Sequence, residues 1–227
     1  MSSAEAKADR SPYLAHHFES IEQQEESCTL GMWLFLAQEV MFFGGLFMAY
    51  AVYRYMYPDA WLEGSGALSI KIGGINTVVL LVSSFSMAMG VYYCQIGNSK
   101  NLFRALLVTL FLGFVFVAIK LKFEYFPKFA EGLFPGDGWG PHGHYADLAS
   151  FGDQGALQIF FFLYFVMTGM HAFHMLIGFV ILVVLMVMTK QNKFGPQRFM
   201  PILFFGLYWH FVDIVWVFIF PMFYLVT

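Results

Sequence analysis

Charged side chains are scarce in this sequence. Lysine, arginine, aspartate and glutamate make up only 12% of the 227 residues, whereas 59% are hydrophobic and 20% are aromatic. Soluble domains carry about 25% charged residues. The composition therefore excludes a soluble globular domain and predicts an integral membrane protein.

The sequence also has no excess of basic residues and few cysteines. The formal net charge is −3, so we expect no basic surface for nucleic acid and no nucleic-acid partner. Only two cysteines are present, Cys28 and Cys94, and both fall where helices are expected to end on the cytoplasmic side. Since thiols stay reduced there, the sequence predicts two free cysteines and no cysteine-rich metal site.

Long apolar runs make up most of what remains. A helix needs about 20 apolar residues to cross the hydrocarbon core of a bilayer. Five runs of that length are present, and none alternates between polar and apolar residues as the strands of a membrane β-barrel do. They are Leu30–Tyr53, Ile70–Gln95, Leu102–Phe126, Ala156–Thr189 and Met200–Val226. The predicted fold is an all-α bundle of five transmembrane helices over residues 30–227, after a polar cytoplasmic segment over residues 1–29.

The distribution of lysine and arginine predicts the orientation. Residues 1–29 lack an apolar core, so we expect no signal peptide there. The N-terminal side of the predicted bundle collects the larger share of basic residues, which places the N-terminus in the cytoplasm. Those residues are Lys7, Arg10, Lys100, Arg104, Lys190, Lys193 and Arg198. Five spans then place the C-terminus in the periplasm, together with an irregular loop, rich in glycine and proline, over residues 130–155.

Ionisable residues inside the spans are the candidate functional residues, because a bilayer disfavours them. Glu39 lies well inside the first span, and two interpretations stay open: a protonated carboxyl that donates one hydrogen bond, or a group that acts on lipid or protons. Glu124 lies four residues after Lys120 near the end of the third span. Its interpretation is an ordinary ion pair on the helix surface.

Two further pairs of ionisable residues lie in the last two predicted spans. His171 and His174 are three residues apart and share a helix face with Thr168 and Gly178, which suits either a metal or haem site or two neutral imidazoles at a helix contact. His210 and Asp213 have the same spacing.

Tryptophans flank Asp213 on the same helix. Trp209 and Trp216 offer indole N–H donors to its carboxyl. Asp213 then either orients His210 or a residue of another helix, or belongs to a buried polar clasp between helices.

Four ordered motifs resemble subunit III of the haem-copper respiratory oxidases, the cytochrome c oxidase family. They are GMWLFLAQEVMFFGGLF from Gly31, KFEYF from Lys122, TGMHAFHMLIG from Thr168 and YWHFVDIVWVFIF from Tyr208. A fainter match, INTVVLLVSSFSM, begins at Ile75. The resemblance covers nearly the whole chain from Gly31 onward.

This resemblance implies an accessory subunit of a proton-pumping terminal oxidase, without catalytic residues, metal ligands or a cofactor of its own. Haem and copper are expected in the partner subunits, and phospholipid is expected to be bound. The implied partners are subunit I by direct contact, subunit II and other respiratory subunits, in the bacterial cytoplasmic membrane. Subunit III of this family is credited with sustaining proton uptake, and Glu39 matches the family's intramembrane glutamate, known for its carbodiimide reactivity. Five other motif positions are matched by Glu124, His171, His174, His210 and Asp213.

The N-terminal segment differs from that of the longer family members and limits the resemblance to one form of the subunit. Longer members of the family carry two additional N-terminal helices, whereas Glu19–Glu26 is polar here, so the chain resembles the five-helix bacterial form. A subunit III-like chain of a quinol oxidase or a nitric oxide reductase is the alternative. A membrane di-haem cytochrome, with His171, His174 and His210 as ligands, and a proton transporter are more remote alternatives.

Overall fold

A computed structural model describes residues 18–136 and 138–226, and within these ranges it contains helices and connecting segments but no strand. In the described part of the chain, five helices are long and apolar enough to cross a membrane. They are α2 (Ile21–Met56), α4 (Ile70–Gln95), the continuous stretch from α5 (Ser99–Lys120) to α6 (Phe126–Ala130), α7 (Gln154–Lys190) and α8 (Met200–Tyr224). The all-α membrane fold class and its five spans are therefore confirmed.

The first span begins earlier than its apolar run. Helix α2 starts at Ile21, because the side chain of Ser20 accepts a hydrogen bond from the backbone N–H of Gln23 and caps the first turn. The polar residues before Leu30 continue the same helix. Hydropathy finds the apolar part of a helix and not its capped end, which explains the difference. The expectation for residues 1–17 lies outside the described residues.

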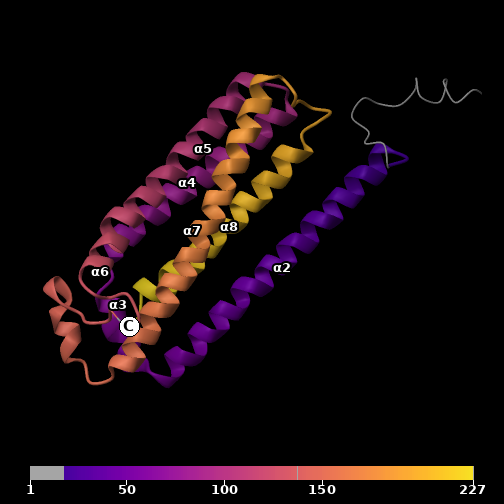
Figure 1. Cartoon of the computed structure of the whole chain (residues 1–227). Helices are drawn as coiled ribbons and strands as arrows, with labels where there is room; N and C mark the ends of the chain where they lie inside the picture. The colour runs from indigo at the N-terminus through magenta and orange to yellow at the C-terminus, as the bar shows by residue number, and fades with distance from the viewer. Residues whose placement is uncertain (1–17, 137, 227) are drawn as a thin grey trace, which may run out of the picture.

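Helices α4, α5, α7 and α8 form one bundle (Figure 1). Serine side chains allow α4 and α5 to pack closely: Ser83 Oγ donates to the carbonyl of Thr109 at 3.3 Å, and Ser86 Oγ donates to that of Ala105 at 3.0 Å. Large side chains fill the centre, and Phe116, Trp209 and Trp216 are almost completely buried. This bundle carries His171, His174, His210 and Asp213, whereas Glu39 lies on α2.

Helix α2 lies beside this bundle rather than within it. Figure 1 shows α2 slanting away from α7 and α8 toward its N-terminal end. Only Glu39, Phe43 and Tyr50 of α2 are buried. The Tyr50 hydroxyl donates to the carbonyl of Met222 and attaches the C-terminal half of α2 to the end of α8.

Short elements gather at one end of the long helices. Helix α3 (Pro58–Gly66) follows α2 directly, with a proline at its first position, which suits a helix start. Its Trp61 is fully buried, with ring centroids 5.8 Å from Tyr50 and 5.5 Å from Phe160. The 3-10 segment η2 (Gly143–Ser150) forms part of the loop predicted to be irregular, and the C-terminus lies at the same end (Figure 1).

A wide helical turn joins α5 to α6. The π-helical segment η1 (Leu121–Tyr125) interrupts the α-helix just before Pro127. Proline has no N–H and its ring clashes with the carbonyl four residues earlier, so a regular α-helix cannot pass this point without distortion. Wide turns of this kind are frequent at functional sites, and η1 contains Glu124.

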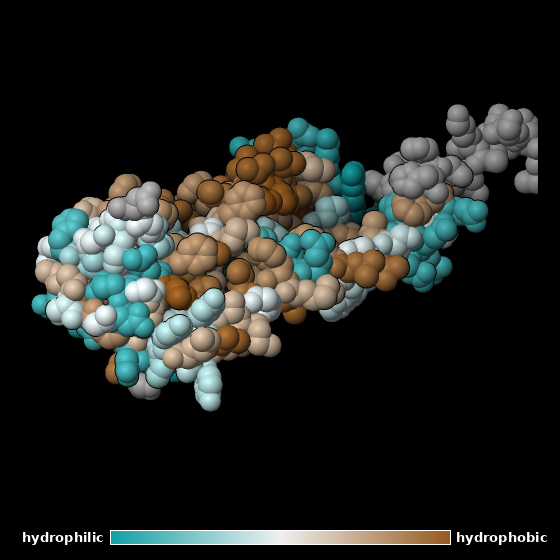
Figure 2. Space-filling model, turned by 60° about the horizontal axis from the view of Figure 1, so that its bottom comes forward, coloured by the Kyte–Doolittle hydropathy of each residue, from teal (hydrophilic) through white to brown (hydrophobic). Residues whose placement is uncertain are grey.

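The surface matches the membrane assignment. In Figure 2, brown hydrophobic side chains cover the flanks of the long helices, whereas teal hydrophilic side chains gather toward both ends. Large apolar side chains such as Met41, Phe85 and Phe111 are more than 60% exposed. A multi-pass protein with these flanks is integral to a membrane.

Candidate functional site

Glu39 and His174 form a pair between α2 and α7. Glu39 Oε2 lies 3.0 Å from His174 Nε2, and both residues are buried although most of α2 is exposed. The other ring nitrogen, Nδ1, lies 2.8 Å from the carbonyl oxygen of Met170. The Tyr208 hydroxyl donates to the carbonyl of His174 at 2.8 Å and links α8 to the same point.

Hydrogen-bonding rules fix how many protons this pair holds. A carbonyl oxygen only accepts, so Nδ1 of His174 carries a hydrogen. The contact between Nε2 and Oε2 then needs one shared proton, which gives either a neutral carboxylic acid facing a neutral imidazole or a carboxylate facing an imidazolium. The Glu39–His174 pair is neutral overall in both states. A proton can therefore move within the pair without changing its net charge.

The pair lies at the wall of an apolar cleft between α2 and the bundle. The cleft has a volume of about 470 Å³ and is lined by eleven residues from α2, α7 and α8. They are Met32, Phe35, Glu39, His174, Ile177, Ile181, Leu185, Pro201, Phe204, Phe205 and Tyr208. Hydrocarbon chains suit such a lining, and Glu39 and His174 bring ionisable groups to it.

His171 does not share the environment of His174. Its ring packs between Phe116 and Trp216, with centroid distances of 5.6 and 5.2 Å, inside the main bundle. Neither ring nitrogen has a hydrogen-bond partner among the described residues. The alternative in which both imidazoles lie at one helix contact is not observed, because α7 directs His174 toward α2 and His171 toward α5 and α8.

Gly178, on the same helix as these histidines, allows Trp209 to pack closely against α7. A Cβ atom placed there would lie 2.8 Å from a ring carbon of Trp209. Gly169 is different, because a Cβ there would lie 3.8 Å from the Tyr125 hydroxyl, an ordinary contact.

His210 and Asp213 also have different partners from those expected. His210 Nδ1 lies 2.6 Å from Ser84 Oγ of α4. The carboxyl of Asp213 is buried, and within residues 18–136 and 138–226 neither of its oxygens has a geometrically satisfied hydrogen bond, although the Ser84 side chain is a neighbour.

The two indoles predicted to donate to Asp213 donate elsewhere. Trp209 Nε1 donates to Ser83 Oγ at 3.2 Å, and Trp216 Nε1 donates to Thr77 Oγ1 at 3.1 Å. Small hydroxyls on α4 are thus the partners of α8. Residue spacing along one helix cannot show this, since it says nothing about the facing helix.

Glu124 belongs to a buried cluster of four residues, which we call the Lys120 cluster: Lys120, Glu124, Tyr164 and Tyr224. Lys120 Nζ pairs with Glu124 Oε2 and also lies 3.0 Å from the Tyr164 hydroxyl and 2.5 Å from that of Tyr224. Both tyrosine hydroxyls donate to Glu124 Oε2, that of Tyr164 at 2.5 Å. The ion pair exists as predicted, but its position on the helix surface is wrong, because Glu124 is only 1% exposed.

The sequence offered one signal for this cluster, a lysine inside an apolar run. A buried ammonium needs both an opposite charge and further hydrogen bonds. Helices α7 and α8 supply those hydrogen bonds through Tyr164 and Tyr224. Neither tyrosine stands out in a sequence with 12 tyrosines, so the sequence does not predict the part that they play in this cluster.

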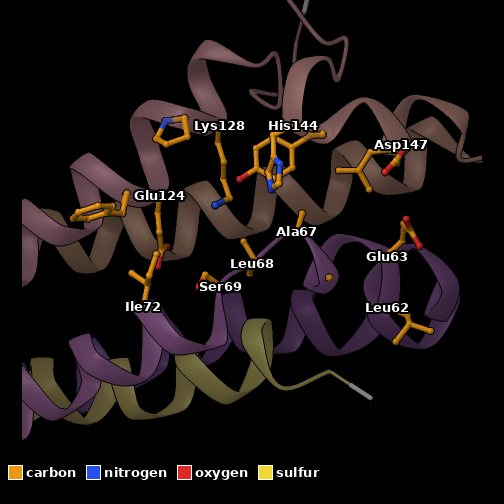
Figure 3. Close-up of a pocket in the computed structure, with 15 residues that line it drawn as sticks. Leu62, Glu63, Ala67, Leu68, Ser69, Ile72, Glu124, Lys128, His144 and Asp147 are labelled. Atoms are coloured by element: carbon orange, nitrogen blue, oxygen red, sulfur yellow. The ribbon is translucent and has the colours of Figure 1, made fainter.

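A second, polar cleft opens beside Glu124 at the end that carries the short elements. It has a volume of about 660 Å³ and is enclosed by α3, the start of α4, the turn from η1 to α6, and η2 (Figure 3). Lys128, Glu63, His144 and Asp147 line it together with Glu124.

A tyrosine lies at the wall of this polar cleft. Burial, reinforced by the carboxylates of Glu131 and Glu124, raises the pKa of Tyr145 above the ordinary phenol value of 10.0. Its hydroxyl therefore stays a neutral donor at physiological pH.

The candidate site residues do not gather into a metal centre. No group of three or more histidine, cysteine, aspartate or glutamate residues in the described chain could hold a metal ion. His171, His174 and His210 contact Trp216, Glu39 and Ser84 respectively. The two cysteines are free thiols, Cys28 exposed and Cys94 buried.

Comparison with known proteins identifies the family. The sequence model of the family described as cytochrome c oxidase subunit III matches residues 8–131 and 148–227. A probable cytochrome c oxidase subunit 3 of Nocardia farcinica is 31% identical over 198 residues, which cover 87% of this chain and 87% of that protein. Cytochrome c oxidase subunit 3 of Corynebacterium diphtheriae is 30% identical over 83% of each chain.

A third relative joins two subunits in one polypeptide. The heme-copper oxidase subunit I+III of Aeropyrum pernix is 31% identical over 201 residues, which cover 86% of this chain and 22% of that protein. Proteins of this family are subunits of terminal oxidase complexes and associate with other oxidase subunits. The chain described here belongs to the cytochrome c oxidase subunit III family.

Proposed function

We propose that this chain is the non-catalytic subunit III of a proton-pumping haem-copper terminal oxidase in the bacterial cytoplasmic membrane. It packs directly on subunit I, assembles with subunit II and other respiratory subunits, binds phospholipid and supports proton uptake during oxygen reduction. Haem and copper belong to the partner subunits. The observation that carries this proposal is the match over nearly the whole chain to a family of oxidase subunits.

Direct contact with subunit I has its own support. In the relative from Aeropyrum pernix, the part similar to this chain is named as one portion of a subunit I+III protein. Two portions of one polypeptide stay at high effective concentration, which suits partners that pack together. The exposed apolar flanks of the bundle give such a partner a surface of matching chemistry.

Support for proton uptake comes from the Glu39–His174 pair. A carboxyl and an imidazole 3.0 Å apart can pass a proton from one to the other without creating a net charge. The pair lines the apolar cleft, where it can meet both lipid and a partner helix. The lipid and proton roles of Glu39 thus have a common location.

The test of subunit identity is a visible spectrum and a mass-spectrometric inventory of what co-purifies with the tagged chain in mild detergent. We expect haem absorbance that follows a large co-purifying subunit and disappears when this chain is isolated. Haem retained by the isolated chain would overturn the proposal in favour of a di-haem cytochrome with His171, His174 and His210 as ligands.

Glu39→Gln tests the proton role separately. The amide still donates a hydrogen bond to Nε2 of His174, so the packing of α2 is kept while the shared acidic proton is lost. We expect the assembled oxidase to keep its haem content and lose turnover by a few fold. Glu26→Gln, a change at an exposed position of the same helix, is the control. Equal turnover and equal pumping stoichiometry in both variants would remove the proton role and leave the subunit assignment intact.

A further inference from the structure

The polar cleft contains a buried cation that has no anionic partner in contact. The Lys128 side chain is only 1% exposed, and its Nζ points into the cleft (Figure 3). Within residues 18–136 and 138–226 it makes neither a hydrogen bond nor an ion pair. Its neighbours are the ring of Tyr164, with its centroid 5.5 Å from Nζ, and the ring of Tyr145, 5.9 Å away.

A cation in this position favours an anionic ligand. Aromatic faces stabilise an ammonium group less than charged hydrogen bonds do, and burial without an anion is costly. The nearest carboxylate is that of Glu124, whose Oε2 is already taken by Lys120, Tyr164 and Tyr224. Lys128 therefore has three N–H donors available for a group that enters the cleft.

The remaining charges of the cleft are negative. Glu124 Oε1 is buried without a hydrogen-bond partner among the described residues, and Glu63 and Asp147 are exposed among the lining residues. A simple anion would meet Lys128 but also approach three carboxylates. A ligand that carries a phosphate at one end and a protonated amine at the other satisfies both sets of groups.

The mouth of the cleft also has an apolar side. Phe123 and Leu62 line it and are 52% and 54% exposed, and Ile72 of α4 adjoins them. Phe123 and Ile72 belong to membrane-spanning helices, so hydrocarbon covers this side in a bilayer. Acyl chains can lie on these residues while their headgroup enters between η2 and the start of α4.

We propose that the polar cleft is a binding site for a zwitterionic phospholipid headgroup of the phosphoethanolamine type. The phosphate accepts hydrogen bonds from Lys128 Nζ, and the ammonium group donates to the exposed carboxylates of Glu63 and Asp147, which lie on the side of Lys128 away from Glu124 (Figure 3). This site is separate from the apolar cleft beside Glu39, since the two share no lining residue. It does not depend on the proton role of Glu39 or on the identity of the oxidase.

The first test is native mass spectrometry of the full chain, purified with its partners, with phosphatidylethanolamine or phosphatidylglycerol added to the detergent. We expect preferential retention of phosphatidylethanolamine. Lys128→Met, which keeps most of the side-chain length, should weaken it about tenfold, as loss of a charged hydrogen bond does. Lys122→Met removes an exposed lysine that does not line the cleft and should leave retention unchanged.

The source of the phosphate group is tested by competition. Inorganic phosphate and free phosphoethanolamine are each added to the lipid-loaded protein. Failure of both to displace the lipid supports a membrane headgroup, as proposed. Displacement by a low concentration of free phosphoethanolamine would instead identify a site for a soluble zwitterion and overturn the lipid assignment.

A second variant keeps the proposal testable if Lys128→Met fails to fold. Glu63→Gln with Asp147→Asn removes two exposed carboxylates and leaves the buried residues in place. We expect it to shift the preference from phosphatidylethanolamine toward phosphatidylglycerol by several fold, because the amine loses its partners. An unchanged preference in this variant, or equal loss in Lys128→Met and Lys122→Met, would refute the proposed headgroup site.

Discussion

At the scale of single residues, the feature with the largest desolvation cost is a buried lysine–glutamate pair. Lys120 and Glu124 are 4% and 1% exposed, so both charges are removed from water. Desolvation of two charges costs several kcal/mol, which their attraction offsets only with additional hydrogen bonds. Tyr164 and Tyr224 provide these bonds, and the ring of Trp216 lies 4.8 Å from Lys120 Nζ. The Lys120 cluster is thus stable as a unit, and each member depends on the others.

We predict that Glu124→Leu destabilises the chain far more than the joint change of Glu124→Leu and Lys120→Met. The single change leaves an uncompensated buried ammonium, which costs about 3–5 kcal/mol, or a fall of roughly 10 °C in Tm. The double change removes both charges and should recover most of that loss. Thermal unfolding in detergent, followed by tryptophan fluorescence, measures both variants. Equal losses in the single and double variants would mean that the charges do not act as a pair.

The sequence identifies the important ionisable residues better than it identifies their partners. Glu39 and His174 stand out because a bilayer disfavours ionisable groups, and the structure brings these two together. His171 is also an ionisable residue inside a span, but its ring packs between those of Phe116 and Trp216. Which residue faces which depends on the rotation of each helix about its axis, and one sequence does not contain that information.

Close packing between helices is the main feature at the scale of elements. Gly178 of α7 allows Trp209 of α8 to lie against the helix, since a Cβ atom there would be 2.8 Å from the indole. Such contacts replace the hydrophobic effect as a source of helix association within lipid.

We predict that Gly178→Ala weakens the contact between α7 and α8, whereas Gly44→Ala does not harm the fold. The added methyl group at Gly178 has to move a fully buried tryptophan, at a cost of about 1–3 kcal/mol. A Cβ atom at Gly44 meets nothing within 4 Å, so alanine there should stabilise helix α2 by up to about 1 kcal/mol. Comparison of Tm for the two variants in the same detergent tests this. A greater loss for Gly44→Ala would contradict the packing described for α7 and α8.

The predictability of the elements follows from their length and composition. All five spans follow from apolar length alone, and the bounds of Ile70–Gln95 coincide with those of α4. Helix α3 is too short to register in a search for spans, and η1 depends on the local effect of Pro127. Short helices and wide turns are set by caps, prolines and tertiary contacts, which hydropathy does not measure.

At the scale of the whole molecule, α2 stands partly apart from a compact four-helix bundle (Figure 1). Only 11% of the apolar window of α2 is buried, compared with 56% for that of α8. Hydropathy treats the two helices alike, because it reports transfer into lipid and not contact with other helices. The separation of α2, and the apolar cleft that it creates, were therefore absent from the sequence prediction.

Orientation in the membrane is the last prediction at this scale. The charge distribution places the N-terminal end of α2 in the cytoplasm and η2 in the periplasm, and these two segments lie at opposite ends of the long helices (Figure 1). A membrane-impermeant maleimide should therefore label the exposed Cys28 in inside-out vesicles only. In a Cys28→Ser background, Ala149→Cys on η2 should be labelled in right-side-out vesicles only. Cys94 is buried and serves as the internal control, which should react only after denaturation. Reversed labelling would move the polar cleft with Lys128 to the cytoplasmic leaflet, and its lipid would then have to come from that leaflet.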